Sequence, residues 1–346
     1  MLTHDDDATI HQAGEVPEWR ESFYVNFADT ESRFYGAAWQ GLRPNVGVAE
    51  ATFLLFDRKT ARVRSVDTAL QVPGDSDRRS LGNQRFECID PWSHWRVHYE
   101  DDAAKLQIDW RQTTATIDHD PTGTPGQDVD GELPEDEASF YRVAKHFEAT
   151  GTIDCVGEID GEPIAFTGFG TRDRAWGPRN YGLLRFMWWQ TVQFPDGDAV
   201  HVMLLRDADD AINLFGMLHR DGRSLPATIA EVDVAYDDAV TGAPVSGSQR
   251  FVDVEGRELV ITGMEPMHVA PMTILADGTD VVPRRVESPD EKVYFWTWQR
   301  FVRSDGVVGH GMVDQAYWQG LQQSRFASTA ATGRLYDFGL TEEPAR

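Results

Sequence analysis

The chain has 346 residues, of which 41% are hydrophobic and 11% aromatic, so it is long enough and apolar enough to fold around a sizeable core. Its formal net charge of −25 argues against nucleic acid or an anionic membrane surface as a partner, because both bind clustered cations. Two cysteines are too few for a disulfide scaffold, and without a signal-peptide pattern or a long apolar run we expect a cytoplasmic protein with no membrane span.

Strand patterns dominate the first half of the chain. Residues 1–17 lack such a pattern, and we expect them to form an N-terminal tail. β-Branched and aromatic residues then alternate with polar ones, as in half-buried strands, over residues 22–27, 33–39, 52–56, 62–70, 95–99 and 105–116. Residues 119–137 interrupt the alternation with Pro, Gly and acidic residues, which predicts a long loop or linker.

The same alternation continues in the second half, where short turns separate the predicted strands. Asp160-Gly161, Asp221-Gly222 and similar pairs supply the left-handed backbone that tight hairpins require. Beyond residue 326 the pattern fades, and we expect a C-terminal tail over 327–346. The strands predicted here cover 145–156, 163–168, 184–194, 200–205, 211–219, 228–236, 248–254, 257–262, 293–303 and 309–318.

Many strands joined by short hairpins indicate an all-β protein built from antiparallel barrels or sandwiches. The strands before and after the acidic loop roughly halve the chain. About 300 strand-rich residues exceed one small barrel, which favours two β domains. One large barrel with an insertion is the alternative.

The most informative stretch is Gly-Phe-Gly-Thr-Arg-Asp-Arg-Ala-Trp-Gly-Pro-Arg, residues 168–179, at the end of a predicted strand. Its charged residues cannot lie in an ordinary core strand without partners, because unpaired buried charge is costly. A tryptophan, in turn, has no use in a solvated turn, and an aromatic block follows closely. The stretch therefore indicates either a structural cluster of ion pairs or a site for a mostly apolar ligand.

This stretch resembles the motif of the carotenoid hydratase (hydroxyneurosporene synthase) family, approximately Gly-x-Arg-Asp-His-Ser-Trp-Gly-x-Arg. Weaker likenesses lie at residues 21–27 with 43–45, and at 309–318. The resemblance implies two consecutive lipocalin-like or calycin-like antiparallel β-barrel domains, which we place at 18–182, including the acidic loop, and at 183–326. It also implies an enzyme that hydrates, cyclises or rearranges polyenes or terpenoids without a redox cofactor.

Two positions depart from the family pattern. Arg174 stands where the hydratases have a histidine that helps to move protons, and arginine stays protonated at any working pH. Further downstream the hydratases carry a Tyr-x-Asp pair, where this chain has His201-Val202-Met203. Trp176 is retained. The resemblance therefore supports the fold more strongly than it supports hydration of a carotenoid.

Asp173, Trp176 and His201 are the candidate catalytic residues. Protonating an alkene requires an acid, which a carboxyl group kept neutral in an apolar pocket provides, and an indole face stabilises the resulting cation. Salt-bridging of Asp173 to the neighbouring arginines is the structural alternative. His201, on an alternating strand, is a general acid or base, or else a satisfied core histidine.

Further residues are candidates for binding a ligand. Arginines in the motif would orient a ligand or bridge the domains, tryptophans would line an apolar pocket, and a tyrosine or histidine would contact polar parts of the ligand. The candidate ligand-binding residues are Tyr24, Arg172, Arg174, Arg179, Trp188, Trp189 and His310.

No metal or cofactor is expected. His94 and His98 share one strand face, but no third ligand lies near them in the sequence. Dinucleotide, phosphate-loop and nucleophile-elbow motifs are absent from the sequence.

Three functional hypotheses follow. The first is an enzyme of the lyase or isomerase type that hydrates, dehydrates, isomerises or cyclises a hydrophobic isoprenoid or terpenoid, steroid or polyketide-like substrate. The second is a non-catalytic lipocalin-like binder of a hydrophobic small molecule. In the third, the charged motif only locks two domains of an accessory protein together. The oligomeric state is left open.

Overall fold

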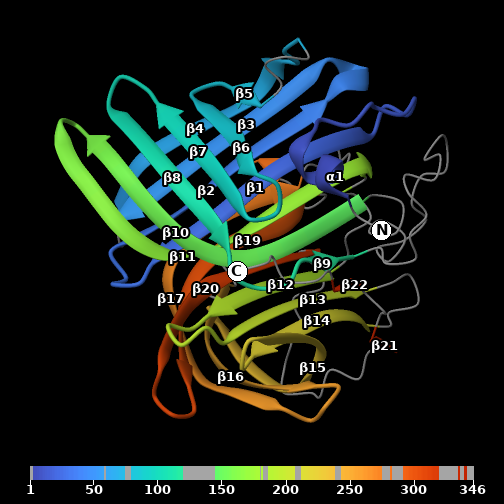
Figure 1. Ribbon diagram of the computed structural model, residues 1–346, viewed down its shortest axis with the longest axis vertical. Helices are drawn as coiled ribbons and strands as arrows, with labels where there is room; N and C mark the ends of the chain where they lie inside the picture. The colour runs from blue at the N-terminus through green and yellow to red at the C-terminus, as the bar shows by residue number, and fades with distance from the viewer. Residues whose placement is uncertain are drawn as a thin grey trace. The chain divides into compact units, whose positions relative to one another are not determined.

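Two compact units make up the computed structural model of the chain (Figure 1). Unit 1 comprises Met1–Leu133, Tyr141–Arg179 and Gly339–Arg346, and unit 2 comprises Pro134–Phe140 and Asn180–Phe338. The structure describes residues 3–57, 60–74, 79–119, 145–179, 181, 186–206, 212–237, 243–274, 281–282, 291–318, 334–335 and 339–340. The expected domain boundary at 182/183 and nearly all of the expected acidic loop lie outside these residues.

Unit 1 is a strongly twisted antiparallel sheet in the order β4-β3-β2-β1-β11-β10-β8-β7-β6-β5, with β9 pairing β10 and β22. β1 lies at its centre, between β2 and β11. The elements of unit 1 are α1 (His4–Ala8), β1 (Trp19–Asp29), β2 (Phe34–Arg43), η1 (Pro44–Val46), β3 (Val48–Asp57), β4 (Thr60–Gln71), β5 (Ser80–Leu81), β6 (Gln84–Asp90), β7 (His94–Glu100), β8 (Ala104–Gln112), β9 (Ile117–Asp118), β10 (Lys145–Ile159), β11 (Glu162–Pro178) and β22 (Gly339–Leu340).

Unit 2 is a closed barrel. Its strands follow the order β13-β12-β20-β19-β17-β16-β15-β14, and β14 pairs back to β13; β18 and β21 add short pairings to β17 and β14. The elements of unit 2 are β12 (Phe186–Gln193), β13 (Ala199–Arg206), β14 (Ile212–Arg220), β15 (Arg223–Asp237), β16 (Ala243–Asp253), β17 (Glu258–Ile274), β18 (Val281–Val282), β19 (Lys292–Arg303), β20 (Val308–Trp318) and β21 (Arg334–Leu335).

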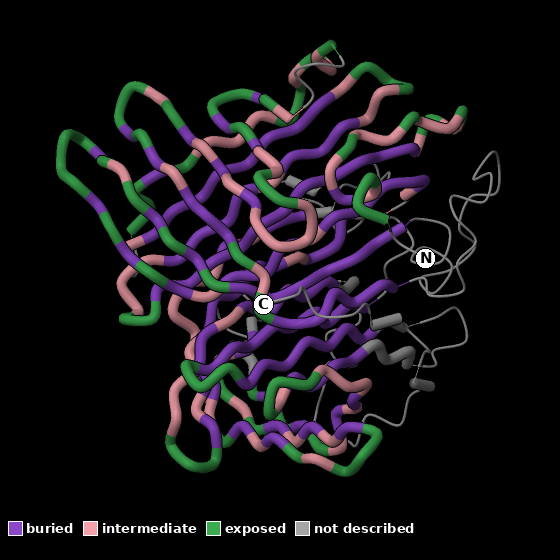
Figure 2. Tube along the Cα trace, viewed as in Figure 1, coloured by how far each residue is buried: buried purple, intermediate pink, exposed green. Residues whose placement is uncertain are grey.

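Each unit has its own apolar core, on what we call the inner face of its sheet. In unit 1 this core includes Phe23, Val25 and Trp110, and in unit 2 it includes Trp188 and Phe301. Figure 2 shows that buried residues run along the strands and exposed residues gather at the hairpin ends. The predicted all-β fold of two lipocalin-like barrels is confirmed.

The predicted Asp-Gly hairpins are confirmed at two turns. Asp160 and Gly161 have φ angles of 52° and 78°, and Asp221 and Gly222 have φ angles of 54° and 71°. Consecutive left-handed residues match the right-handed twist of the flanking strands, which is why aspartate and glycine are suited to these positions.

The segment expected as an N-terminal tail packs onto unit 1. Asp7 is fully buried, Ile10 lies against two of the apolar clusters, and Ala13 and Val16 pack against a third, which contains Trp176. The segment forms no strand; one turn of helix, α1, is its only regular element among the described residues. Its position therefore depends on side-chain contacts.

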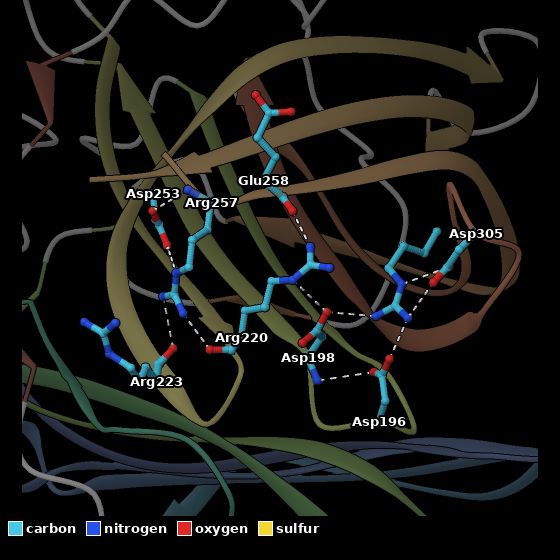
Figure 3. Close-up of polar contacts among 9 residues, drawn as sticks. Asp196, Asp198, Arg220, Arg223, Asp253, Arg257, Glu258 and Asp305 are labelled. Atoms are coloured by element: carbon cyan, nitrogen blue, oxygen red, sulfur yellow. Dashed lines mark hydrogen bonds and ion pairs between the residues drawn. The ribbon is translucent and has the colours of Figure 1, made fainter. Parts of the chain in front are cut away.

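One end of the unit 2 barrel is tied together by arginines and carboxylates from its hairpin turns. Arg303, at the end of β19, contacts Asp198 at 2.8 Å, Asp196 at 2.5 Å and Asp305 at 2.8 Å. These aspartates belong to the β12–β13 and β19–β20 turns, so a single guanidinium joins two hairpins. Figure 3 labels Asp196, Asp198, Arg220, Arg223, Asp253, Arg257, Glu258 and Asp305 at this end.

In the part of the chain that the structure describes, none of the helices is long and apolar enough to cross a bilayer.

Candidate functional site

Strand β11 carries the charged motif, and its alternation separates the motif into two sets. It pairs with β1 on one side and β10 on the other. Arg172, Arg174 and Trp176 project to the inner face, opposite core residues such as Phe23. Asp173 projects to the other face, which we call the outer face. Asp173 and Trp176, which the sequence analysis placed together in one pocket, therefore lie on opposite faces of the same strand.

On the outer face, Asp173 contacts a histidine and not an arginine. Nε2 of His146 lies 2.5 Å from Oδ2 of Asp173 and 2.7 Å from Oε1 of Glu148. The register of the β10–β11 pairing explains these contacts, since Glu148 on β10 stands directly opposite Asp173, and His146 is two residues away on the same face. Among the three, the side chain of Asp173 is 18% exposed, whereas those of His146 and Glu148 are 3% and 1% exposed.

The two carboxylates determine the protonation of His146. Burial alone would lower its pKa, but the charges of Asp173 and Glu148 outweigh burial and raise the pKa to about 9. At neutral pH His146 is therefore an imidazolium that donates from Nε2 to Oδ2 of Asp173 and forms an ion pair with Glu148. The cluster holds a proton in a buried position, with one partly accessible carboxylate at its edge.

A second histidine completes this group. The ring of His119 stacks on that of His146 at a centroid distance of 4.4 Å, and its Nε2 lies 3.6 Å from Oε1 of Glu148. Burial lowers the pKa of His119, and the positive charge of His146 lowers it further. The stacked pair thus has one charged and one neutral ring. We call His119, His146, Glu148 and Asp173 the acid–histidine cluster.

Polar side chains continue along the outer face beside this cluster. Tyr24 on β1 stands directly opposite Asp173, and Asn26 stands opposite Thr171. Nδ2 of Asn26 and Oγ1 of Thr171 are buried and have no hydrogen-bond partner among the residues that the structure describes. Buried polar atoms are almost always satisfied in folded proteins, so these two atoms lack the partner that such positions normally have.

The arginines of the motif are paired on the inner face. Nη2 of Arg172 lies 2.6 Å from Oδ1 of Asp7. Nη1 of Arg174 lies 2.9 Å from Oε1 of Glu21, and both of these side chains are buried. The expected pairing between Asp173 and the neighbouring arginines is absent from the described contacts; alternation turns Arg172 and Arg174 to the other face, and Arg179 lies beyond the end of β11.

Trp176 is also engaged on the inner face. The ring of His11 stacks on its indole at a centroid distance of 3.8 Å, and Phe147 meets it edge-on at 6.0 Å. Near the end of the motif, the backbone N–H of Arg179 donates to the carbonyl of Glu18 at 3.0 Å.

In unit 2, the predicted site residues also divide between faces. Nε1 of Trp189 donates to Nε2 of His201 at 3.0 Å on the outer face. Because an indole nitrogen can only donate, Nε2 of His201 acts as an acceptor in this contact. Trp188, the preceding residue, points to the inner face and donates to Gln190 at 2.9 Å. His310 lies buried on β20. The two tryptophans therefore do not line a common surface.

The outer face of unit 2 also holds a tyrosine–aspartate pair. The hydroxyl of Tyr294 donates to Oδ2 of Asp314 at 2.5 Å, and Asp314 stands directly opposite Trp189. Burial, together with the charge of Asp314, raises the pKa of Tyr294 well above its usual range. This hydroxyl therefore stays protonated and acts as a hydrogen-bond donor.

His119, His146, Glu148 and the Tyr294–Asp314 pair were not among the residues predicted from the sequence. A signal was present for two of them. His146 and Glu148 are polar residues at alternating positions near the start of a predicted strand, which places them on one face. Linking them to Asp173 required the β10–β11 register, which the spacing along the sequence does not give.

Donor atoms of His146, Glu148 and Asp173 lie within 4.8 Å of one another, so we asked whether a metal ion fits there. The contacts of 2.5 Å and 2.7 Å are hydrogen-bond distances. They require the proton on Nε2 of His146, the same atom that would have to coordinate a metal. The geometry therefore suits a shared proton better than a bound metal ion.

Several solved structures resemble the chain. A protein described as an AttH from Nitrosomonas europaea has a TM-score of 0.57 at 16% identity, covering 92% of this chain and 97% of its own. CghA has a TM-score of 0.56 at 12% identity, and the match covers 90% of this chain and 93% of CghA. Kievitone hydratase from Nectria haematococca has a TM-score of 0.53 at 11% identity, and the match covers 92% of this chain and 93% of the hydratase. At these identities the likeness shows the fold alone.

A comparison with curated proteins gives no match. A family model described as a domain of unknown function, DUF7064, matches residues 4–315, and this range includes α1, β11 and the acid–histidine cluster. Since the model covers most of the chain, the protein belongs to the DUF7064 family.

Proposed function

We propose that the protein is an enzyme that moves a proton on a hydrophobic small molecule, with Asp173 as the group that touches the substrate. The observation that carries the proposal is the contact of 2.5 Å between Asp173 and His146. It joins a partly accessible carboxylate to a buried proton store. General acid–base groups of this kind accelerate reactions by about 10²–10⁴-fold.

The reaction class is hydration, dehydration, isomerisation or cyclisation, without a redox cofactor. In hydration, the proton on Nε2 of His146 passes through Oδ2 of Asp173 to one alkene carbon, the oxygen of water bonds to the other carbon, and the proton that water loses returns through Asp173 to His146. His146 positions Asp173 and exchanges a proton with it. Tyr24, directly opposite on β1, is placed to donate a hydrogen bond to the substrate or to the attacking water.

Two further facts support this class. One of the proteins with the same fold is named as a hydratase. The motif of residues 168–179 resembles that of the carotenoid hydratases, which suggests a polyene or terpenoid substrate; a steroid or polyketide-like alkene fits the same chemistry. Asn26 and Thr171 would then bind a polar substituent of the substrate.

A binder of hydrophobic ligands is the second candidate, and one observation favours it. Arg174 replaces the histidine of the hydratases and is fully buried in its pair with Glu21. In that arrangement, position 174 cannot move protons. A protein that kept the fold but lost this residue would bind the ligand without converting it.

The test is turnover of terpenoid, steroid and polyketide-like alkenes in D2O, with mass spectrometry to detect deuterium on carbon. Asp173→Asn should lower turnover at least about 100-fold in protein that circular dichroism shows to be folded. Asp154→Asn is the matched control, because Asp154 lies on the neighbouring strand in an exposed ion pair with Arg111. Wild-type turnover in Asp173→Asn would contradict the assignment of Asp173. Ligand-dependent tryptophan fluorescence without any product would favour the binder.

A further inference from the structure

The inner face of unit 1 contains a buried guanidinium surrounded by aromatic rings. The carbon Cζ of Arg172 lies 4.9 Å from the ring centroid of Trp95, 5.1 Å from that of Trp110 and 5.4 Å from that of Phe147. Its side chain is 3% exposed. A cation in such surroundings requires an anion, because a buried charge without one is strongly unfavourable.

That anion comes from the N-terminal segment. Asp7 contacts Arg172 through Oδ1, and its Oδ2 accepts from Nε1 of Trp95 at 2.9 Å and from the backbone N–H of Trp92 at 2.6 Å. Three residues later, Ile10 packs against the apolar core. Residues 7–10 thus present a carboxylate followed by an apolar body to the interior of unit 1.

Asp7 leaves part of the hydrogen-bonding capacity of Arg172 unused. Nε of Arg172 is buried and has no hydrogen-bond partner in the described part of the chain, and the same is true of Nε of Arg174. A guanidinium offers a fork of donors that a free carboxylate can engage with both oxygens. Asp7 contacts Nη2 of Arg172 and leaves Nε without a hydrogen-bond partner among the described residues.

Side-chain contacts, and not strand pairing, hold the segment to the rest of unit 1. Residues 3–17 pair with no strand in the described structure, and Thr3–Asp6 ahead of the buried carboxylate are mostly exposed. Besides Asp7, the carbonyl of Ala8 accepts from Arg79 at 3.0 Å, and that of Thr9 accepts from Arg174 at 2.5 Å. Further along, the backbone N–H of His11 donates to Glu21, and the carbonyls of Gly14 and Val16 accept from Asn45. Segments with few backbone pairings open at low free-energy cost.

We propose that Arg172, with Trp95, Trp110 and Phe147, forms a binding site for a carboxylic acid with an apolar body, and that residues 7–10 occupy this site as a tethered competitor. The site is distinct from the acid–histidine cluster, because Arg172 and Asp173 lie on opposite faces of β11. A tethered carboxylate acts at an effective concentration of about millimolar, so it lowers the apparent affinity of an external acid without abolishing binding.

The experiment compares dodecanoate with dodecanol, which has the same apolar body but no carboxylate. Asp7→Asn removes the competing charge and leaves Arg172 in need of an anion. Dodecanoate should therefore bind Asp7→Asn at least about tenfold more tightly than it binds the wild type, and should raise the melting temperature of the variant more. Asp5→Asn, on the exposed part of the same segment, should behave like the wild type.

Cys88 provides an independent readout. Burial raises the pKa of its thiol to about 11, and the charge of Asp7 adds to this rise. In a Cys155→Ser background, Asp7→Asn should therefore speed alkylation of Cys88, and dodecanoate should slow it again. A merely structural role for Asp7 would give faster alkylation that dodecanoate and dodecanol affect equally.

Equal effects of dodecanoate and dodecanol on Asp7→Asn would overturn the proposal. If Asp7→Asn does not fold, the wild type and the double variant Asp7→Asn/Arg172→Gln decide the same question. The double variant replaces the ion pair with two neutral amides, so it should lose the preference for dodecanoate over dodecanol that the wild type shows. No preference in the wild type, or the same preference in the double variant, refutes the site.

Discussion

The acid–histidine cluster of unit 1 and the Arg303 network of unit 2 both combine cations with carboxylates, yet they differ in where the charges lie. Arg303 joins carboxylates of hairpin turns, and two of these, Asp196 and Asp305, are 47% and 54% exposed (Figure 3). His146 lies between carboxylates in the middle of a sheet and is 3% exposed. Most charges of the Arg303 network are therefore partly solvated, whereas those around His146 are almost fully removed from water, where an unpaired charge is far more costly.

The difference also concerns what each cation can do. An arginine stays protonated, and its carboxylates raise the pKa of Arg303 further above its usual range. The network can therefore hold turns together but cannot exchange protons near neutral pH. His146, with a pKa of about 9, can exchange its proton. This difference supports a structural role for the unit 2 network and is the reason that the proposed chemistry is placed at the unit 1 cluster.

Replacing His146 should have the largest effect on stability. His146→Gln leaves Glu148 and Asp173 side by side without their cation, which should cost about 3–5 kcal/mol of unfolding free energy. His98→Gln is the matched control, because His98 contacts Glu87 at 2.8 Å but both side chains are about one-third exposed. Urea titration of both variants measures the difference. Equal losses of unfolding free energy in the two variants would show that burial does not make the ion pairs of His146 more important for stability than the exposed pair of His98.

The pH dependence of stability should reveal the two histidines separately. The pKa of His146 is raised from 6.5 to about 9, so its contribution is fully present below pH 6.5 and is lost as the pH rises through 9. This loss is on the order of 3 kcal/mol. The pKa of His119 is lowered, so its neutral form contributes stability above pH 6.5 that is lost as the pH falls.

Unfolding free energies from pH 5 to pH 10 measure both effects. His146→Gln should remove the decline on the alkaline side, and His119→Gln should weaken the decline on the acid side. An unchanged alkaline decline in His146→Gln would mean that another group causes it.

Disrupting the unit 2 network should have the smallest effect. Arg303→Met breaks contacts to three aspartates, of which Asp198 alone is largely buried, so we expect a loss of about 1–2 kcal/mol. High salt should reduce the difference from the wild type, because exposed charges are screened. Turnover of the folded variant should stay at the wild-type level. A large loss of turnover would break the distinction between the two regions.

Local patterns in the sequence were enough to predict the strands and many turns. Alternation predicted most of β8 and β19 and about half of β1 but only residues 163–168 of β11, and Asp-Gly pairs predicted hairpins, because both signals depend on neighbouring residues. The motif around Asp173 also stood out, since charges in a strand require partners.

The partners themselves could not be predicted. Asp173 meets His146 through a pairing between strands, and Arg172 meets an aspartate from the N-terminal segment. Both contacts depend on register and on distant parts of the chain, which no local pattern encodes. Assigning the arginines to Asp173 was natural from their adjacency, but adjacent residues of a strand face opposite ways.

The pairing of β1 with β11 has a consequence for how the protein is made. Trp19 pairs with Pro178 and Asp29 with Gly168, so β1 lacks one neighbour until most of unit 1 has left the ribosome. During that interval an apolar strand edge is open to other chains, which is a known route to aggregation. Such distant pairing also predicts slow folding. Expression at low temperature or with chaperones should therefore raise the yield of folded protein.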